Sequence, residues 1–375
     1  MEREGTSVLT GMQPNPTMCI VGETGPTLFG LTPVERLRRQ FARQGVEPAN
    51  HAGSVIVARA DAILDQPLIA LLIATPSLLL VSESGRTPLA AHVKDRDVTA
   101  TVALLSGAES AVELNPRTPA ELNVQFWKSL RKRETPYAFA VTPASAAAVE
   151  RRMFMGTYKG ATDIVTKHLW PVPAFHVTRW LAGLGVTPNL VTTLSAILMA
   201  LAFWLFLRGD FALGLIAAWL MTFLDTVDGK LARITLTSSK WGDIFDHGID
   251  LVHPPFWYVA WGLALNWPAT TFWWVIAAIL GGYVLQRIME GIAIKWLGLE
   301  IHIWRKFDTL FRQVTARRNP NLILLTLGVL VGRPDWGLLA VAIWTLACLL
   351  LHGLQLMQAL SARRRGPLTS WMMQG

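Results

Sequence analysis

Hydrophobic and polar positions divide the chain into two parts. Residues 1–150 mix charged and small polar residues with short apolar runs, whereas from about residue 187 long apolar runs alternate with short polar breaks. A hydrocarbon core about 30 Å thick needs about 20 apolar residues per helix. The second part therefore predicts an α-helical membrane bundle of about six transmembrane helices, at residues 188–208, 211–233, 242–265, 270–295, 320–333 and 336–361. The fifth of these is short.

The first part has the pattern of a small α/β domain. An apolar run at Met18–Val21 predicts a strand, and a glycine-containing turn and a helical pattern from Thr32 to Gly45 follow it. Further apolar runs at Ser54–Val57 and Ser77–Val81 predict more strands. Because strands alternate with helices, we expect a parallel sheet. The predicted domains are residues 1–150, a linker with an interfacial helix at 151–186, and a membrane domain at 187–365.

Two segments place basic residues beside aromatic ones, which is typical of helices at a membrane surface. One is Ala174–Gly185, and the other is His302–Arg318. Under a six-helix count, nearly all Lys and Arg residues of the second part fall on one side of the membrane. The other side has only Arg208 and Arg333, each near an Asp. Both termini, the α/β domain and the acidic segment described below are therefore predicted to be cytoplasmic, and we expect a bacterial inner membrane.

The formal net charge of +8 changes this picture little. The basic residues flank membrane segments and do not form one run with interleaved aromatics, so lipid headgroups are expected partners and nucleic acid is not. Cys19 and Cys348 lie in different predicted domains, which argues against a disulfide framework or a cysteine metal site. The first 30 residues show no signal-peptide pattern.

Four carboxylates lie inside apolar segments of the membrane part: Asp225, Asp228, Asp246 and Asp250. An ionised side chain at membrane depth costs at least about 2.5 to 3.5 kcal/mol, so such groups usually face a cavity or a counter-ion. Helix positions three or four apart share a face, so two acidic stripes are expected to face each other. Carboxylate oxygens suit Mg²⁺ or Mn²⁺. Nearby, Gly229 and Ala232 leave room for a ligand, and Arg233 suits phosphate.

The spacing of these residues resembles the signature of the CDP-alcohol phosphotransferase family. That signature is Asp-x-x-Asp-Gly-x-x-Ala-Arg, eight residues, then Gly-x-x-x-Asp-x-x-x-Asp, and residues 225–250 match each fixed position. The segment Gly185–Thr192 also resembles the start of the first membrane helix in that family. Together the similar segments cover roughly the last 200 residues.

The resemblance implies a role for each matching residue. Asp225, Asp228 and Asp246 would bind the metal. Asp250 would act as the catalytic base, and would either bind the second metal as well or serve only as the base. The CDP group would contact Asn189, Thr192, Gly229, Ala232, Arg233, Ser239 and Gly242. The resemblance further implies a homodimer, a CDP-alcohol donor, a hydroxyl or phosphorylated alcohol acceptor, and release of CMP.

Other interpretations stay open. The four Asp residues would form a buried ion-pair network if Lys230, Arg233 and Lys240 were their partners. Arg287, Arg317 and Arg318 fit either a phosphorylated acceptor or ordinary interaction with lipid headgroups. A cation channel or transporter would also use acidic residues in a membrane.

The first domain faintly resembles nucleotidyltransferases, whose first strand leads into a glycine-rich phosphate loop. Here that loop, Gly22–Leu28, lacks the basic residues of the family. We therefore expect a degenerate relative, with a bifunctional enzyme that makes its own CDP-alcohol as the alternative.

Overall fold

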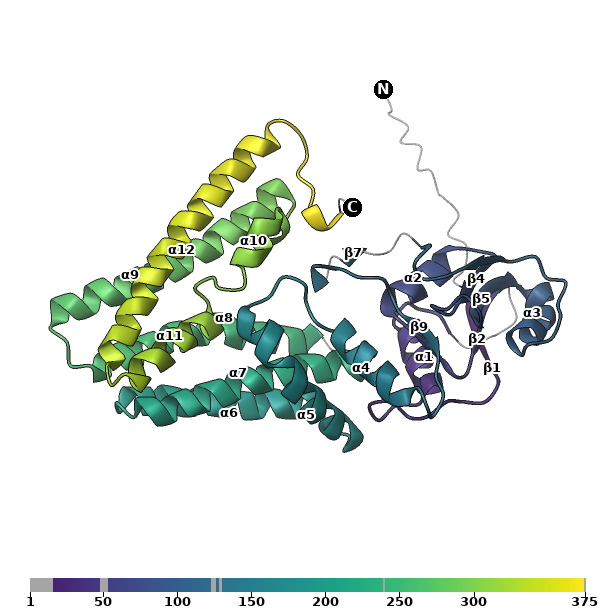
Figure 1. Cartoon of the computed structure of the whole chain (residues 1–375), viewed down its shortest axis with the longest axis horizontal. Coiled ribbons are helices and arrows are strands. Elements are labelled where there is room, and N and C mark those ends of the chain that lie inside the picture. The colour runs from purple at the N-terminus through teal and green to yellow at the C-terminus, as the bar shows by residue number, and fades with distance from the viewer. Residues whose placement is uncertain (1–15, 48–52, 123–125, 128–129, 239, 374–375) are drawn as a thin grey trace, which may run out of the picture. The chain divides into compact units, whose positions relative to one another are not determined.

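The computed structural model contains two compact units, Met1–Gln125 with Thr135–Val149, and Phe126–Glu134 with Glu150–Gly375. We call them the α/β unit and the helical unit, and each is described by itself (Figure 1). The structure describes residues 16–47, 53–122, 126–127, 130–238 and 240–373. At residues 126–127, 240–247 and 249–251 it describes the backbone alone.

The α/β unit is built on a five-stranded sheet with the strand order β1-β2-β5-β4-β6. Its strands are β1 (Thr17–Val21), β2 (Ser54–Arg59), β4 (Leu78–Val81), β5 (Pro88–Lys94) and β6 (Asn115–Arg117). A separate pair joins β3 (Ala62–Leu64) to β9 (Ala138–Ala140). The helices are α1 (Pro33–Ala42), α2 (Gln66–Ala74) and α3 (Val98–Leu105), and α4 (Ala146–Gly156) includes the point where the units divide.

The prediction of a parallel sheet is wrong. β1 and β2 are parallel, as are β4 and β6, but β5 pairs antiparallel with both β2 and β4. The turn Ser82–Thr87, which the backbone N–H of Ser82 closes by donating to the carbonyl of Thr87 at 2.8 Å, returns the chain directly beside β4. A short hairpin turn can join only antiparallel neighbours, so the strand at Pro88–Lys94, which the sequence pattern missed, makes the sheet mixed.

Successive side chains of β2 point to opposite faces of the sheet, and both faces are buried. Ile56 and Ala58 pack with Leu37, Phe41 and Leu68 of α1 and α2, whereas Val55 and Val57 pack with Leu105 of α3. Thr32 caps α1 by accepting from the backbone N–H of Glu35 at 3.2 Å, and Pro33 occupies its first turn. The sheet therefore lies between two helical layers, which confirms a small α/β fold.

The helical unit contains a helix at each position where a membrane span is predicted. These are α6 (Pro188–Leu207), α7 (Phe211–Ile234), α8 (Lys240–Ala264), α9 (Ala269–Ile292), α11 (Arg318–Leu330) and α12 (Pro334–Arg363). Among the described residues, four stretches are long and apolar enough to cross a membrane: Pro188–Leu207, Phe211–Ile234, Ala269–Leu297 and Pro334–Arg363. These helices make the helical unit integral to a membrane, while the count of six stays a prediction.

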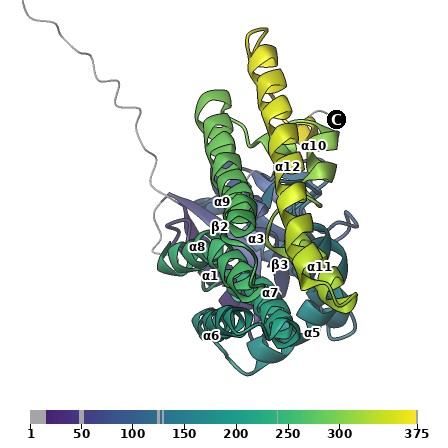
Figure 2. The same cartoon turned by 90° about the vertical axis from the view of Figure 1, so that its left-hand side faces the viewer.

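Close packing fixes the helices against one another, and Figure 2 shows α9 beside α12 and α6 beside α7. A Cβ at Gly214 of α7 would overlap the Phe206 ring of α6, and a Cβ at Gly328 of α11 would lie 2.6 Å from Cα of Gly337 in α12. Trp261 of α8 is fully buried and donates to the Pro334 carbonyl at 3.1 Å. Small residues at such contacts are typical of membrane helix pairs.

The two predicted surface segments are partly helical. The first forms α5 (Pro171–Gly183), with Val172 and Trp180 exposed, and the second contains α10 (Lys306–Phe311), with Phe307 and Leu310 exposed. Short β7 (Phe126–Trp127) and β8 (Lys132–Arg133) form a two-stranded pair in the same unit. Arg208 pairs with Asp210 at 3.5 Å and Arg333 with Asp335 at 2.5 Å.

Candidate active site

Helix α7 places the first half of the signature on one stripe, because Asp225, Asp228 and Gly229 are three or four residues apart. The Oδ2 atom of Asp225 accepts from Nη2 of Arg318 at 2.5 Å, and both side chains are mostly buried. The Oδ2 atom of Asp228, whose residue is 3% exposed, accepts from the hydroxyl of Thr192 on α6 at 2.7 Å. Both carboxylates are therefore oriented by neighbouring helices.

A cavity of about 360 Å³ opens beside this stripe. It brings signature residues Asp225, Gly229 and Arg233 together with Arg287, Arg317 and Arg318, which the sequence predicts for the acceptor. Its other lining residues are Arg131, Lys159, Ala161, Thr162, Asp163, Thr166, Thr226, Lys230, Pro254, Tyr283, Arg312 and Asn319. Among the described side chains, eight Lys and Arg residues and two Asp residues line it. Such an excess of cations favours an anionic ligand.

The remaining predicted residues lie elsewhere or outside the described set. Asn189 is exposed, and neither it nor Thr192 nor Ala232 lines the cavity. Ser239 lies outside the described residues. Gly242, Asp246 and Asp250 lie on α8, whose backbone alone is described there, so the structure gives no positions for their side chains.

The chemistry of the donors fits a hard divalent cation. Asp225 and Asp228 supply carboxylate oxygens on one face of α7, the ligand type that Mg²⁺ and Mn²⁺ prefer. Arg318 places a cationic group against Asp225, where a positive charge is needed to balance the carboxylate. Within the described side chains, which exclude Asp246 and Asp250, no three His, Cys, Asp or Glu residues group closely enough for one metal ion.

The alternative of an ion-pair network with Lys230 receives no support from the contacts of that lysine. Lys230 is 4% exposed, and its Nζ donates to the Thr157 carbonyl at 3.1 Å. The same atom lies 3.2 Å from the centroid of the Tyr158 ring, a cation–π contact. Lys230 therefore attaches the segment around residue 157 to α7. The side chain of Lys240 is outside the described set.

Sequence reasoning missed several cavity residues that precede the signature. Arg131 is held by Oε2 of Glu300 at 2.7 Å, and Asp163 Oδ1 accepts from Nδ2 of Asn319 at 3.0 Å. A Cβ at Gly160 would overlap the Arg131 carbonyl oxygen, so glycine allows these two segments to meet. The two hydrogen bonds join residues more than 150 positions apart, and no local pattern reveals them.

Arg312 is a further missed residue, and it lies in the segment predicted to lie flat at the membrane surface. It is 9% exposed, and its Nε and Nη1 atoms have no hydrogen-bond partner among the described atoms. Burial, and then the nearby charge of Arg317, lower the pKa of the Arg312 guanidinium. Since guanidinium stays charged in proteins, this lowering indicates a buried cation that an anionic ligand would stabilise.

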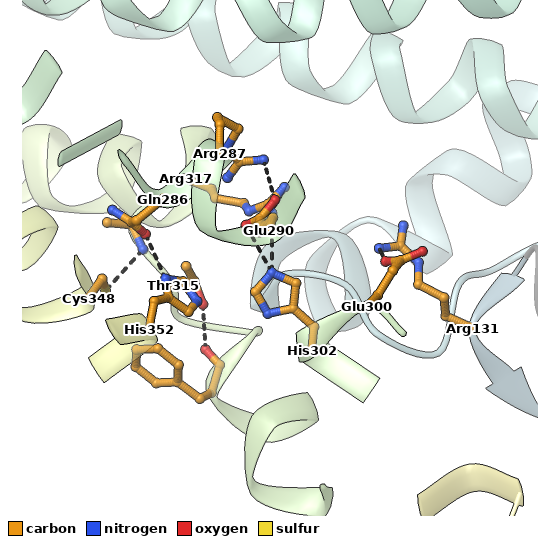
Figure 3. Close-up of polar contacts among 12 residues, drawn as sticks. Arg131, Gln286, Arg287, Glu290, Glu300, His302, Thr315, Arg317, Cys348 and His352 are labelled. Carbon is orange, nitrogen blue, oxygen red and sulfur yellow. Dashed lines mark hydrogen bonds and ion pairs between the residues drawn. The ribbon is translucent and has the colours of Figure 1, made fainter. Parts of the chain in front are cut away.

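Glu290, at the end of α9, forms ion pairs with two arginines that line the cavity (Figure 3). Its Oε1 accepts from Nη2 of Arg317 at 2.5 Å, and its Oε2 accepts from Nη1 of Arg287 at 3.0 Å. The imidazole of His302 also bonds Oε1, at 3.0 Å. Burial lowers the pKa of His302 to about 3, although the Glu290 carboxylate opposes that shift, so the ring is neutral near pH 7.

Comparisons with known proteins agree with the signature. The family described as CDP-alcohol phosphatidyltransferase matches residues 185–317. Choline/ethanolaminephosphotransferase 1 of Arabidopsis thaliana is 47% identical over 70 residues, 18% of this chain and 18% of that protein. Phosphatidylinositol phosphate synthase of Streptomyces avermitilis is 38% identical over 95 residues, 25% and 37% of the two chains. Archaetidylinositol phosphate synthase of Pyrococcus horikoshii is 32% identical over 117 residues, 30% and 59%.

The family match lies within the helical unit. The chain spans less than two thirds of the length of each of the three relatives. The family match begins three residues before α6 and ends at Arg317, at the start of α11, and so includes both halves of the signature. Over residues 185–317, the chain is similar to the CDP-alcohol phosphatidyltransferase family.

Proposed function

We propose that the protein transfers a phosphoalcohol group from a CDP-alcohol to a hydroxyl of a phosphorylated alcohol and releases CMP. One observation carries this proposal: a single cavity contains the signature residues Asp225, Gly229 and Arg233 and the basic residues Arg287, Arg317 and Arg318. A donor diphosphate and an acceptor phosphate are both anionic, and both therefore suit this wall.

We propose that the CDP-alcohol donor binds at the face of α7 that carries Asp225, Asp228 and Gly229. Asp225, Asp228 and Asp246 would hold Mg²⁺ or Mn²⁺, with Asp250 as a further ligand, and a bound divalent ion supplies charge neutralisation and Lewis acidity to a diphosphate. Gly229 and Arg233 line the cavity beside these carboxylates, which suits contact with the diphosphate. We assign Asn189, Thr192, Ala232, Ser239 and Gly242 to the remainder of the CDP site.

The transfer step needs a base and a positioned hydroxyl. Asp250 accepts the proton of the acceptor hydroxyl, the hydroxyl oxygen forms a bond to the phosphorus that carries the donor alcohol, and the bond from that phosphorus to the CMP oxygen breaks. A carboxylate is a competent base when burial raises its pKa toward the working pH. The arginines hold the acceptor so that its hydroxyl faces this phosphorus.

The acceptor is proposed to be a phosphorylated polyol. Beside an acceptor without charge, the buried guanidinium of Arg312, whose Nε and Nη1 have no hydrogen-bond partner among the described atoms, would stay uncompensated, which is costly. Two of the three relatives carry "inositol phosphate" in their names, which supports products of this chemical class. The product would then belong to phospholipid or inositol-phosphodiester synthesis.

The α/β unit is proposed to be a cytoplasmic, non-catalytic domain. A Cβ at Gly25, in the loop that resembles a phosphate loop, would lie 2.6 Å from Cγ1 of Val141. Packing within the unit therefore explains this glycine without a nucleotide. We also propose a homodimer with both termini cytoplasmic, and with residues 1–150, 151–186 and 187–365 as domain, linker and membrane domain.

A substrate screen tests the proposed function. The purified full-length protein is incubated with Mg²⁺, CDP-diacylglycerol or soluble CDP-alcohols, and one acceptor at a time, and CMP is measured by mass spectrometry. Inositol phosphate and glycerol phosphate are compared with inositol, glycerol, serine and diacylglycerol. We expect CMP release with a phosphorylated acceptor and none with Asp250→Asn. Equal release with uncharged acceptors would contradict the acceptor assignment, and full activity of Asp250→Asn would remove Asp250 as the base.

A further inference from the structure

We propose that Glu290 is a positioning residue that holds Arg287 and Arg317 in the orientation needed to bind the acceptor phosphate. This inference rests on the proposed function and adds a residue that lies outside the family signature. Glu290 does not line the cavity, whereas both of its arginine partners do. It therefore acts on the ligand only through them.

The carboxylate uses both oxygens to join the two arginines. Nη1 of Arg287 donates to Oε2, and Nη2 of Arg317 donates to Oε1 (Figure 3). The side chain of Glu290 is 17% exposed, and those of the arginines are 24% and 23% exposed. Charged hydrogen bonds between such poorly hydrated groups fix side-chain geometry strongly. The bonds also come from different elements, since Arg287 is on α9 and Arg317 precedes α11.

Repulsion explains why a carboxylate is needed at this point. Arg287, Arg312 and Arg317 line one cavity, and the nearby Arg317 lowers the pKa of Arg312 by charge repulsion in addition to burial. Like charges this close favour conformations that move them apart. Glu290, which does not line the cavity, compensates two of them, and the Nε atoms of Arg287 and Arg317 have no hydrogen-bond partner among the described atoms. The wall is thereby assembled before the acceptor arrives, which reduces the cost of ordering these side chains on binding.

His302 is the third hydrogen-bond partner of the Glu290 carboxylate. It is 2% exposed, and it is neutral near pH 7. Since an ionised carboxylate only accepts hydrogen bonds, Nε2 of His302 must carry the proton that bonds Glu290. The 3.3 Å approach of Arg317 Nη2 to the same Nε2 is then a contact between two donors that share Oε1. Glu290 therefore receives three donors, which holds its carboxylate in place.

Glu290→Gln tests this role. A carboxamide has one accepting oxygen, so it cannot accept from both arginines through separate oxygens and must direct its NH₂ group at one donor. We expect the KM for the phosphorylated acceptor to rise about 10- to 100-fold, with kcat and the KM for the CDP-alcohol changed less than about threefold. Glu290→Asp keeps the charge on a shorter side chain and is expected to give an intermediate KM.

Gln286 offers a matched control one turn earlier on α9. It is 1% exposed and bonds His352 and the Thr345 carbonyl, not the arginines. Gln286→Met is expected to leave the acceptor KM unchanged. An effect equal to that of Glu290→Gln would show that general packing, not arginine positioning, controls the KM. Equal loss of kcat with every substrate in Glu290→Gln would also overturn the proposal.

A second readout does not depend on activity. Phenylglyoxal modifies accessible arginines, and peptide mass mapping of the full-length protein reports the modification rate at Arg287 and Arg317. We expect faster modification at both positions in Glu290→Gln, and no change at Arg208. Unchanged rates would overturn the positioning role. If the wild-type protein releases no CMP with any acceptor, the proposed function fails, while this measurement still tests Glu290.

Discussion

The two units of this chain place their large apolar side chains in opposite ways. In the α/β unit, Ile56 and Phe41 are fully buried, and they belong to the core that β2 forms with α1 and α2. All exposed large apolar side chains among the described residues belong to the helical unit, from Met155 to Met373. Trp274 and Leu350, for example, are 74% and 71% exposed on candidate membrane spans.

The difference shows which solvent each unit is built for. A water-soluble fold buries its apolar groups, whereas a membrane helix exposes them to lipid and turns polar groups inward. In the helical unit the buried cations Lys230 and Arg312 line the same cavity as Asp225 of the signature. We therefore locate the chemistry in the helical unit, and the following predictions test that division.

The largest effect is expected from the signature aspartates. Asp228→Asn removes a buried charge that the Thr192 hydroxyl orients, and we expect CMP release to fall more than about 1,000-fold, since metal binding requires the ionised carboxylate. Chelation by EDTA should have a similar effect, and Mg²⁺ or Mn²⁺ should restore activity. Asp335→Asn is the control, because Asp335 pairs with Arg333 at an exposed helix start. Residual activity of Asp228→Asn above about a tenth of wild type would contradict the metal assignment.

A smaller effect is expected at Arg131, which precedes the family match but lines the cavity. Arg131→Gln removes one cation from the wall and leaves Glu300 without its 2.7 Å partner. We expect the KM for the phosphorylated acceptor to rise about 5- to 20-fold, with kcat nearly unchanged. The matched control is Arg96→Gln, whose side chain is 78% exposed in the α/β unit. No change in Arg131→Gln would restrict the site to residues of the family domain.

His302 predicts a pH dependence of stability. Its pKa is about 3 in the folded protein, against an ordinary value of 6.5 for histidine. As the pH falls, the unfolded chain protonates this histidine before the folded chain does. The free energy of unfolding is therefore unaffected by this group above about pH 6.5 and falls progressively toward pH 3. At pH 4.5 the loss is about 2 to 3 kcal/mol. Thermal unfolding in detergent should therefore show a smaller drop between pH 7 and 4.5 in His302→Gln, and an identical drop would contradict the buried, neutral ring.

The smallest effect is expected in the α/β unit. Glu23→Gln and Thr24→Ala change the loop that resembles a nucleotide-binding turn, and we expect CMP release within about twofold of wild type, because this loop lies outside the signature. The full-length protein given CTP and phosphoalcohols should release no pyrophosphate. A tenfold loss of transfer in these variants, or pyrophosphate release from CTP, would show that the α/β unit takes part in the chemistry.

Helix positions were largely predictable from sequence. Polar breaks such as Arg208–Asp210 and the glycine and proline residues near them end apolar runs clearly, so the predicted span 211–233 corresponds to α7 at Phe211–Ile234. The mixed sheet was not predictable in the same way, because the apolar run of β5 contains small alanines and the polar His92. Pairing direction depends on chain reversal, not on strand composition.

The candidate site was predictable only in part. Fixed spacing predicts Asp225 and Asp228 as metal ligands, and the structure shows that these residues are neighbours on one helix and that Asp225 lines the cavity. Arg131, Glu290 and Arg312 were not identified, since their roles depend on contacts between segments distant in sequence. The ion pair between Arg318 and Asp225 was also unexpected, because the sequence assigned these residues to acceptor and metal separately.

The most direct test of the central claim is a crystal structure of the protein with CDP and Mn²⁺, using the anomalous signal of manganese. We predict a peak bound by the carboxylates of Asp225 and Asp228, with CDP beside Gly229 and Arg233 and with Arg318 released from Asp225. A manganese peak at another location, with Arg318 still paired to Asp225 and the cavity wall unoccupied by CDP, would contradict the account.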